Sequence, residues 1–226
     1  MSYRRATSQS SLEERPRGLG SERRRTKRGT TIARRKLIFE SLEDRRLLAV
    51  RLWDGDAGDV WSLAANWVGD VAPAPGDDLV FPASAANKTN TNDLPAGTRF
   101  NTIQIQGSGY DISGAVIELS GGLTANNATG SNTLGLDLRL VNAQTFFAAN
   151  SGTTLNLSGT IDTGNLPGTT YVLGTSALTL DGSGAMSFTA ASRITGYGSV
   201  TKLGDGTATL AGANDYLGIT DVRQGV

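Results

Sequence analysis

The sequence predicts an all-β protein built as a β-solenoid. Glycine is abundant, with 29 of 226 residues, and short apolar-x-apolar segments are interleaved with Gly, Ser, Thr and Asn. Such a pattern favours many short strands over long helices. A single unit of strand and glycine turn cannot bury its apolar face alone, so we expect the repeated units to stack. A β-sandwich made from the same strands is the alternative fold.

The first element, residues 1–49, is predicted to be a disordered basic export leader. Residues 1–50 contain 14 Lys and Arg against 6 Asp and Glu, whereas the rest of the chain contains 7 against 15. This asymmetry is typical of a tail whose role differs from that of the body. Met1–Lys36 has few apolar residues to offset the entropy cost of ordering. Two other interpretations stay open: a solvated tail without a role, and an arginine-rich arm that contacts nucleic-acid phosphates.

A short motif favours the leader interpretation. The apolar residues Leu37–Phe39 are followed at once by charged residues, unlike the apolar region of about 7–15 residues in an ordinary signal peptide. Phe39–Ala49, with the sequence FESLEDRRLLA, instead resembles the leader motif of large secreted proteins of planctomycete-type bacteria. The resemblance implies export, with processing near Ala49.

Residues 50–82 are predicted to form a cap at the start of the solenoid. This segment contains all three tryptophans of the chain, Trp53, Trp61 and Trp67. The open end of a solenoid needs an apolar cover, so we interpret the three rings as that cover. The alternative is that the rings stack on sugars, which would make the segment a carbohydrate-binding site.

Residues 83–226 are predicted to form the solenoid itself. The clearest strand is Leu134–Val141, in which leucines alternate strictly with other residues, as in a half-buried strand. Several strands end in a glycine turn, but the turns recur at uneven intervals. The other predicted strands are Thr102–Gln106, Ala115–Leu119, Thr154–Leu157, Leu178–Leu180, Met186–Phe188, Val200–Leu203 and Thr207–Leu210.

The segment at 200–226 carries the most specific pattern. Val200–Gly225, VTKLGDGTATLAGANDYLGITDVRQG, resembles the autotransporter-associated β-strand repeat, with Ala208 and Ala211 where Leu and Ser are usual. We expect the glycines to adopt positive φ at tight corners, Asn214 to bond turn backbone or stack with other asparagines, and Tyr216 to offer an apolar ring with a polar end. The structural residues of this repeat are Lys202, Gly204, Gly206, Gly212, Asn214, Tyr216, Gly218 and Val222.

The resemblance implies a fold and a location. Members of that family form right-handed parallel β-helices that are displayed at the cell surface or released from it. The segment from Trp53 to Asp78 resembles the opening that often precedes such repeats. No membrane barrel follows Val226 in this sequence, so a longer protein and a different export route both stay open.

The composition weighs against several kinds of chemistry. The chain has no His and no Cys, which removes the usual general base, thiol nucleophiles and Cys-rich metal sites. Asp54, Asp56 and Asp59 do not have the spacing of an EF-hand loop, and Asp77 and Asp78 are adjacent, so a strand would point them to opposite sides. We therefore expect no catalytic residues, no metal and no cofactor.

We expect an exported, non-catalytic module that acts as a scaffold, an adhesin-like passenger or a matrix component. It would be secreted, or attached to the cell surface and the outer membrane. The expected partners are extracellular polysaccharide or other cell-surface components, without nucleic acid and without a transmembrane segment. A polysaccharide-acting β-helix enzyme and a carbohydrate-binding module are the alternative functions.

Overall fold

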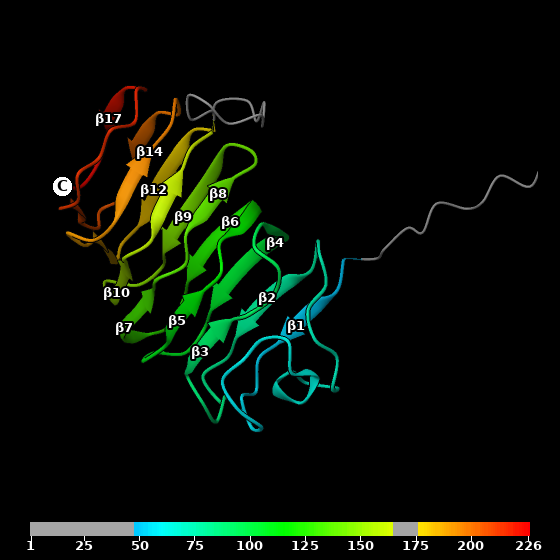
Figure 1. Ribbon diagram of the computed structural model, residues 1–226. Helices are drawn as coiled ribbons and strands as arrows, with labels where there is room; N and C mark the ends of the chain where they lie inside the picture. Colours follow the sequence, from blue (N-terminus) through cyan, green and yellow to red (C-terminus); the bar gives the residue numbers. More distant parts are fainter. Residues whose placement is uncertain (1–47, 165–175) are drawn as a thin grey trace, which may run out of the picture. The chain divides into compact units, whose positions relative to one another are not determined.

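The computed structural model describes residues 48–164 and 176–226, which belong to one compact unit, Arg46–Val226 (Figure 1). The predicted leader falls almost entirely on residues 1–47, outside the described residues. The described part is all-β apart from one 3-10 turn, η1 (Ala64–Asn66). Its strands stack in sequence order, and the chain winds over three sides, which we call A, B and C (Figure 1).

Sides A and C are the two arms of one eleven-stranded sheet. The long strands β4 (Thr98–Ile105) and β6 (Ile117–Ala125) bend from side C to side A, and a register shift between Phe100 and Thr102 marks the bend. Side C consists of the first halves of these two strands, followed by β8 (Leu138–Leu140), β11 (Thr160–Asp162) and β14 (Arg193–Thr195). Side A consists of their second halves together with β1 (Val50–Leu52), β2 (Asp78–Phe81), β9 (Gln144–Ala148), β12 (Leu178–Gly182), β15 (Val200–Lys202) and β17 (Thr220–Val222).

Side B is a separate six-stranded sheet. Each of its strands precedes the side C and side A strands of the same turn. Its members are β3 (Thr89–Asn92), β5 (Asp111–Gly114), β7 (Thr129–Leu134), β10 (Gly152–Leu157), β13 (Ala185–Phe188) and β16 (Ala208–Leu210).

The pairing of the strands distinguishes a solenoid from a sandwich. All ladders between the described strands are parallel, and each strand pairs with its counterpart in the preceding and following turns. A β-sandwich of the predicted kind is built from antiparallel strands. The prediction of a parallel β-solenoid is therefore confirmed, and the sandwich alternative is wrong.

The register also explains the uneven intervals of the glycine turns. On side A the inward residues Ile103, Leu123, Phe146, Leu180 and Lys202 stand in one column. The turn that leads from Phe146 to Leu180 contains much more chain than the turn that leads from Ile103 to Leu123. The turns therefore share a register but differ in the number of residues, because the loops at the corners differ in length.

The predicted strand Leu134–Val141 is two strands joined at a corner. β7 ends at Leu134 on side B, and β8 begins at Leu138 on side C. All four leucines are nevertheless buried, so the alternation of inward side chains continues through the corner. Alternation therefore predicted correctly which side chains point inward, but not where the strand bends.

The interior is filled by columns of apolar side chains. On side B, Ile112, Leu134, Leu157 and Phe188 follow one another in register and are at most 1 % exposed. Burying each such side chain contributes about 1.5–3 kcal/mol to the free energy of folding. Because inward positions are occupied by packing, any binding function has to use the outward positions and the corners.

Candidate functional site

The three predicted tryptophans lie inside the first turn. Trp53, Trp61 and Trp67 are all 0 % exposed. Trp67 packs edge-on against both other rings, with centroid distances of 5.2 and 6.1 Å, and all three surround Phe81. Aromatic pairs of this geometry add about 0.5–1.5 kcal/mol beyond the area that they bury.

The polar atoms of these rings are also engaged inside the protein. The indole N–H groups donate to Asn87 O at 2.7 Å from Trp53, to Asn90 Oδ1 at 2.7 Å from Trp61, and to Trp61 O at 2.9 Å from Trp67. No ring face is left for a sugar, so the glycan-stacking hypothesis is wrong for this structure. The rings fill the end of the solenoid from within.

Lys202 occupies an inward position near the other end. It follows Leu180 in the side A column and is 5 % exposed. Its Nζ donates to Leu203 O at 2.5 Å, to Gly204 O at 2.8 Å and to Gln224 O of the following turn at 3.4 Å. Burial lowers the pKa of the Lys202 ammonium, although Asp181 and Asp205 act in the opposite direction. The side chain therefore links two turns through backbone carbonyls.

The glycines of Val200–Gly225 have a different role from the one predicted. Among the four predicted positions only Gly204 has positive φ, at 68°. A Cβ at Gly206, Gly212 or Gly218 would instead overlap a carbonyl oxygen of the preceding turn, from Gly184, Ser192 or Gly198. These three glycines are required because adjacent turns approach closely at the corners, and not because of their φ angles.

Asn214 and Tyr216 fasten the last corner. Asn214 Oδ1 accepts from Ile194 N at 2.8 Å, and its Nδ2 donates to Gly212 O at 3.0 Å. Asn214 therefore bonds both its own turn and the preceding one, without stacking on another asparagine. The Tyr216 hydroxyl lies 2.5 Å from Thr220 Oγ1, and Val222 stands above Lys202 with 60 % of its surface exposed.

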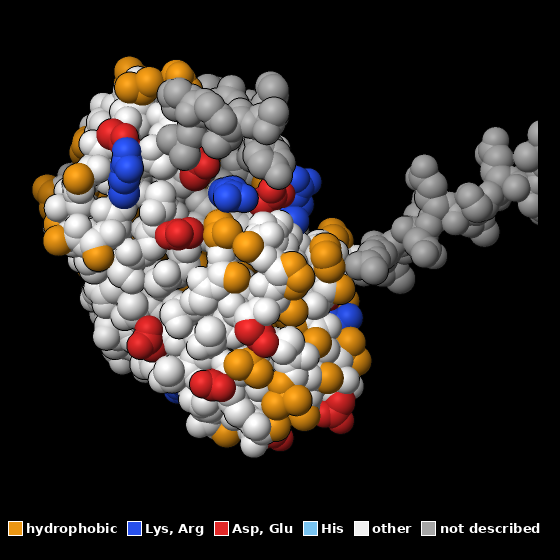
Figure 2. Space-filling view, in the orientation of Figure 1, with side chains coloured by type: hydrophobic (Ala, Val, Ile, Leu, Met, Phe, Trp, Pro, Cys, Tyr) orange, Lys and Arg blue, Asp and Glu red, His pale blue; other side chains and the backbone are white. Residues whose placement is uncertain are grey.

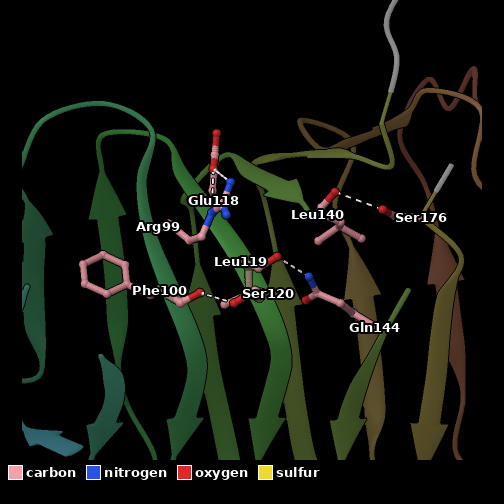
Figure 3. Close-up of polar contacts among 8 residues, drawn as sticks. All are labelled: Arg99, Phe100, Glu118, Leu119, Ser120, Leu140, Gln144 and Ser176. Atoms are coloured by element: carbon pink, nitrogen blue, oxygen red, sulfur yellow. Dashed lines mark hydrogen bonds and ion pairs between the residues drawn. The ribbon is translucent and has the colours of Figure 1, made fainter. Parts of the chain in front are cut away.

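Side C carries a column of alternating charges on its outer surface. Arg99, Glu118, Arg139 and Asp162 follow one another in register over four turns. Arg99 Nε and Nη2 both donate to Glu118 Oε2, at 2.9 and 2.7 Å (Figure 3). The side chain of Arg139 makes no hydrogen bond or ion pair within residues 48–164 and 176–226. Sequence reasoning missed this column because its members lie on different turns and are therefore distant from one another along the chain.

A shallow hollow adjoins Arg139. Its volume is about 190 Å³, which is below the 300–1,000 Å³ typical of pockets for small molecules. Two of its carboxylates already accept backbone N–H groups, Asp137 from Thr160 at 2.7 Å and Asp162 from Gly164 at 2.9 Å. The hollow is lined by Val116, Asp137, Leu138, Arg139, Thr160 and Asp162.

The corner between sides C and A is held by side chains that bond the backbone of a neighbouring turn (Figure 3). Ser120 Oγ donates to Phe100 O at 3.1 Å, and Ser176 Oγ donates to Leu140 O at 3.0 Å. Gln144 Nε2 donates to Leu119 O. These polar residues stabilise the corner, which is a structural role.

The acidic residues considered in the sequence are not gathered into a site. No group of three or more acidic side chains that could hold a metal ion occurs among the described residues. Asp77 accepts from Arg51 Nε at 2.8 Å, and Asp78 accepts from Asn101 Nδ2 at 2.8 Å and from Thr102 Oγ1. Both carboxylates hold neighbouring strands together.

Comparison with known proteins locates one family motif. Residues 33–52 match the family model described as Planctomycete extracellular, which indicates export. The match reaches into β1 but does not extend to the other turns of the solenoid. No curated protein and no solved structure matches the chain. In the described part of the chain, no helix is long and apolar enough to cross a membrane.

Proposed function

We propose that this protein is an exported, non-catalytic β-solenoid that serves as a structural or display module at the cell surface or in the extracellular matrix. One observation carries the proposal: an extracellular leader motif directly precedes a solenoid whose polar side chains bond neighbouring turns. A scaffold needs length, rigidity and a stable surface, and the stacked parallel turns supply them.

The resemblance of Val200–Gly225 to the autotransporter-associated repeat supports an adhesin-like passenger role. Lys202 and Asn214 both bridge adjacent turns, which gives these repeat residues a physical reason to recur. We propose that the outward sides contact extracellular polysaccharide or other cell-surface components, and that no nucleic acid is bound. Association with the outer membrane belongs to the same proposal.

Cell fractionation tests the export step. The full chain, expressed in its native type of cell, should be found outside the cytoplasm with a new amino terminus near Ala49, as read by mass spectrometry. A variant with Leu47→Asp and Leu48→Asp in the leader motif should stay inside, while Ser8→Ala should be exported normally. Recovery of the intact chain, with residues 1–49 attached, from the cytosol alone would refute the proposal.

A further inference from the structure

The outward positions of side B form a regular array of short polar side chains. The strand register aligns one outward residue from each of six successive turns, and we call this array the hydroxyl face. The first column consists of Thr89, Asp111, Thr133, Asn156, Ser187 and Thr209.

A second column lies two residues further along the same strands. Thr91 and Ser113 are register partners, and backbone bonds from Gly135, Ser158 and Thr189 to the preceding turns continue the ladder. Ala211 completes the column, through its N–H bond to Phe188 O. None of these side chains is long, so the face is flat as well as polar.

The hydroxyl face carries far less charge than side C. Asp111 is the one charged residue in its two columns, whereas the corresponding column of side C holds Arg99, Glu118, Arg139 and Asp162. The surface over β7 and β10 is mostly white in Figure 2, with few charged or apolar side chains. A face of this kind offers nothing to a strongly charged partner or to an apolar one.

The polar groups of the first column are available to a ligand. Each side chain is exposed or half-buried. Within residues 48–164 and 176–226, none of them forms a side-chain hydrogen bond, in contrast with the ion-paired Arg99 and Glu118 of side C. Each hydroxyl can both donate and accept.

The spacing of the array is fixed by the backbone. Adjacent residues in a column are about 4.8 Å apart, and the two columns are about 6.6 Å apart along the strands. Threonine is stiff at χ1, so its hydroxyl loses little freedom on binding. A partner that matches such an array is itself repetitive, flat and rich in hydroxyls, since many weak contacts then form together.

We propose that the hydroxyl face binds an ordered, uncharged polysaccharide, whose hydroxyls donate and accept in the same way. Polyanionic polysaccharides are disfavoured, because residues 51–226 contain 15 Asp and Glu against 7 Lys and Arg. The inference rests on the proposed function, in which the module meets polysaccharide outside the cell.

Co-sedimentation of the purified full chain with microcrystalline cellulose or chitin tests the proposal. The variant Thr133→Glu, Asn156→Glu, Ser187→Glu places long charged side chains on three successive turns of the hydroxyl face. We expect it to weaken binding by about tenfold or more, because adjacent contacts are lost together. The control is Thr145→Glu, Thr179→Glu, Thr201→Glu, which adds the same charges to a column on side A. The next outward column of side A carries Phe147 and Asp181, so this face lacks the uniform, almost uncharged polarity of the hydroxyl face, and the control should bind as the unaltered chain does.

Three outcomes would overturn the proposal: no binding of the unaltered chain to either polymer, equal loss in both variants, and sedimentation without polymer, which indicates self-association. If circular dichroism shows that the triple variant does not fold, Ser187→Gln with Thr209→Gln replaces it. Because binding is measured on purified protein, its failure is distinguishable from a failure of export.

Discussion

The first turn of the solenoid encloses three tryptophans around Phe81, whereas the last turns enclose Lys202 and close approaches at Gly206 and Gly212. The first region is stabilised by burial of large aromatic surfaces. The second is stabilised by bonds to backbone carbonyls and by glycines that let the turns touch. The difference teaches that the specific pattern of Val200–Gly225 reflects contacts with the backbone of neighbouring turns, whereas the rest of the core is visible in the sequence only as alternating apolar residues.

Removing an aromatic ring should have the largest effect. Trp61→Ala deletes a fully buried ring that contacts Trp67, Phe81 and Phe100. The free energy of unfolding should therefore fall by about 3–5 kcal/mol. Urea unfolding followed by circular dichroism measures this change. Amide exchange should accelerate in β3 and β4 more than in β15, because contacts in a solenoid are limited to neighbouring turns.

The matched control is Val68→Ala, at a side chain that is 58 % exposed in the same segment. Its effect should stay within about 0.5 kcal/mol. If Trp61→Ala cost no more than this control, the first turn would not depend on its aromatic interior and the contrast between the two regions would fail.

The second largest loss of stability is expected where two of the last turns approach closely. Gly206→Ala would bring a Cβ into the carbonyl oxygen of Gly184, so the turns must separate, at a cost of about 2–3 kcal/mol. Gly109→Ala is the informative comparison, since Gly109 has a φ of 84° and open space around it. There the cost should be about 1–2 kcal/mol, from the left-handed backbone alone. If Gly206→Ala and Gly109→Ala had equal midpoints of urea unfolding, a close approach between turns would cost no more than a positive φ, which would contradict this prediction.

The sequence predicted the inward side chains and the corners of the solenoid, but not the register of its turns. The alternation of Leu134, Leu136, Leu138 and Leu140 indicated the inward direction, and all four are buried. The spacing of glycines indicated corners. Neither pattern contains the long-range register, because the corner loops change the length of chain in each turn without disturbing the core.

The strand β3 escaped prediction for a chemical reason. β3 has the sequence TNTN, and two of its asparagines point inward, where Asn90 accepts from Trp61 and Asn92 bonds Ala115 O. Asparagine is typical of turns, so a strand that buries it resembles a loop. The tryptophans were expected to form an apolar cover, and all three rings are buried in the first turn. The N–H groups of Trp53 and Trp61, however, bond partners that are distant along the chain, which no local pattern reveals.

The buried ammonium in the last turns should give a smaller effect. Lys202→Met keeps most of the apolar stem but removes the donor to Leu203 O and Gly204 O, which should cost about 1–2 kcal/mol. Leu180→Met, at the equivalent position one turn earlier, should cost less than about 1.5 kcal/mol and should leave the exchange of the β17 amides unchanged. Faster exchange in β17 for Lys202→Met alone would show that the lysine links the turns. The same rates in both variants would show that it acts only by filling space.

The smallest loss of stability is expected when acid protonates the Asp77 carboxylate in the first turn. Burial raises the pKa of the Asp77 carboxyl, but hydrogen bonds from Arg51, Ala74 N and Ala49 N outweigh it, so the pKa lies below its usual value of 3.8. A carboxyl with a lower pKa in the folded state contributes stability that is present above pH 3.8 and is lost as the pH falls through the folded pKa. Thermal melts in this range should therefore show a larger loss of stability for the unaltered chain than for Asp77→Asn, in which the lowered pKa values of Asp93 and Asp215 still contribute. Asp70→Asn, in the loop that precedes Asp77, provides the control and should keep the acid dependence of the unaltered chain. An unchanged acid dependence in Asp77→Asn would show that the Asp77 carboxylate does not stabilise the pairing of β1 with β2.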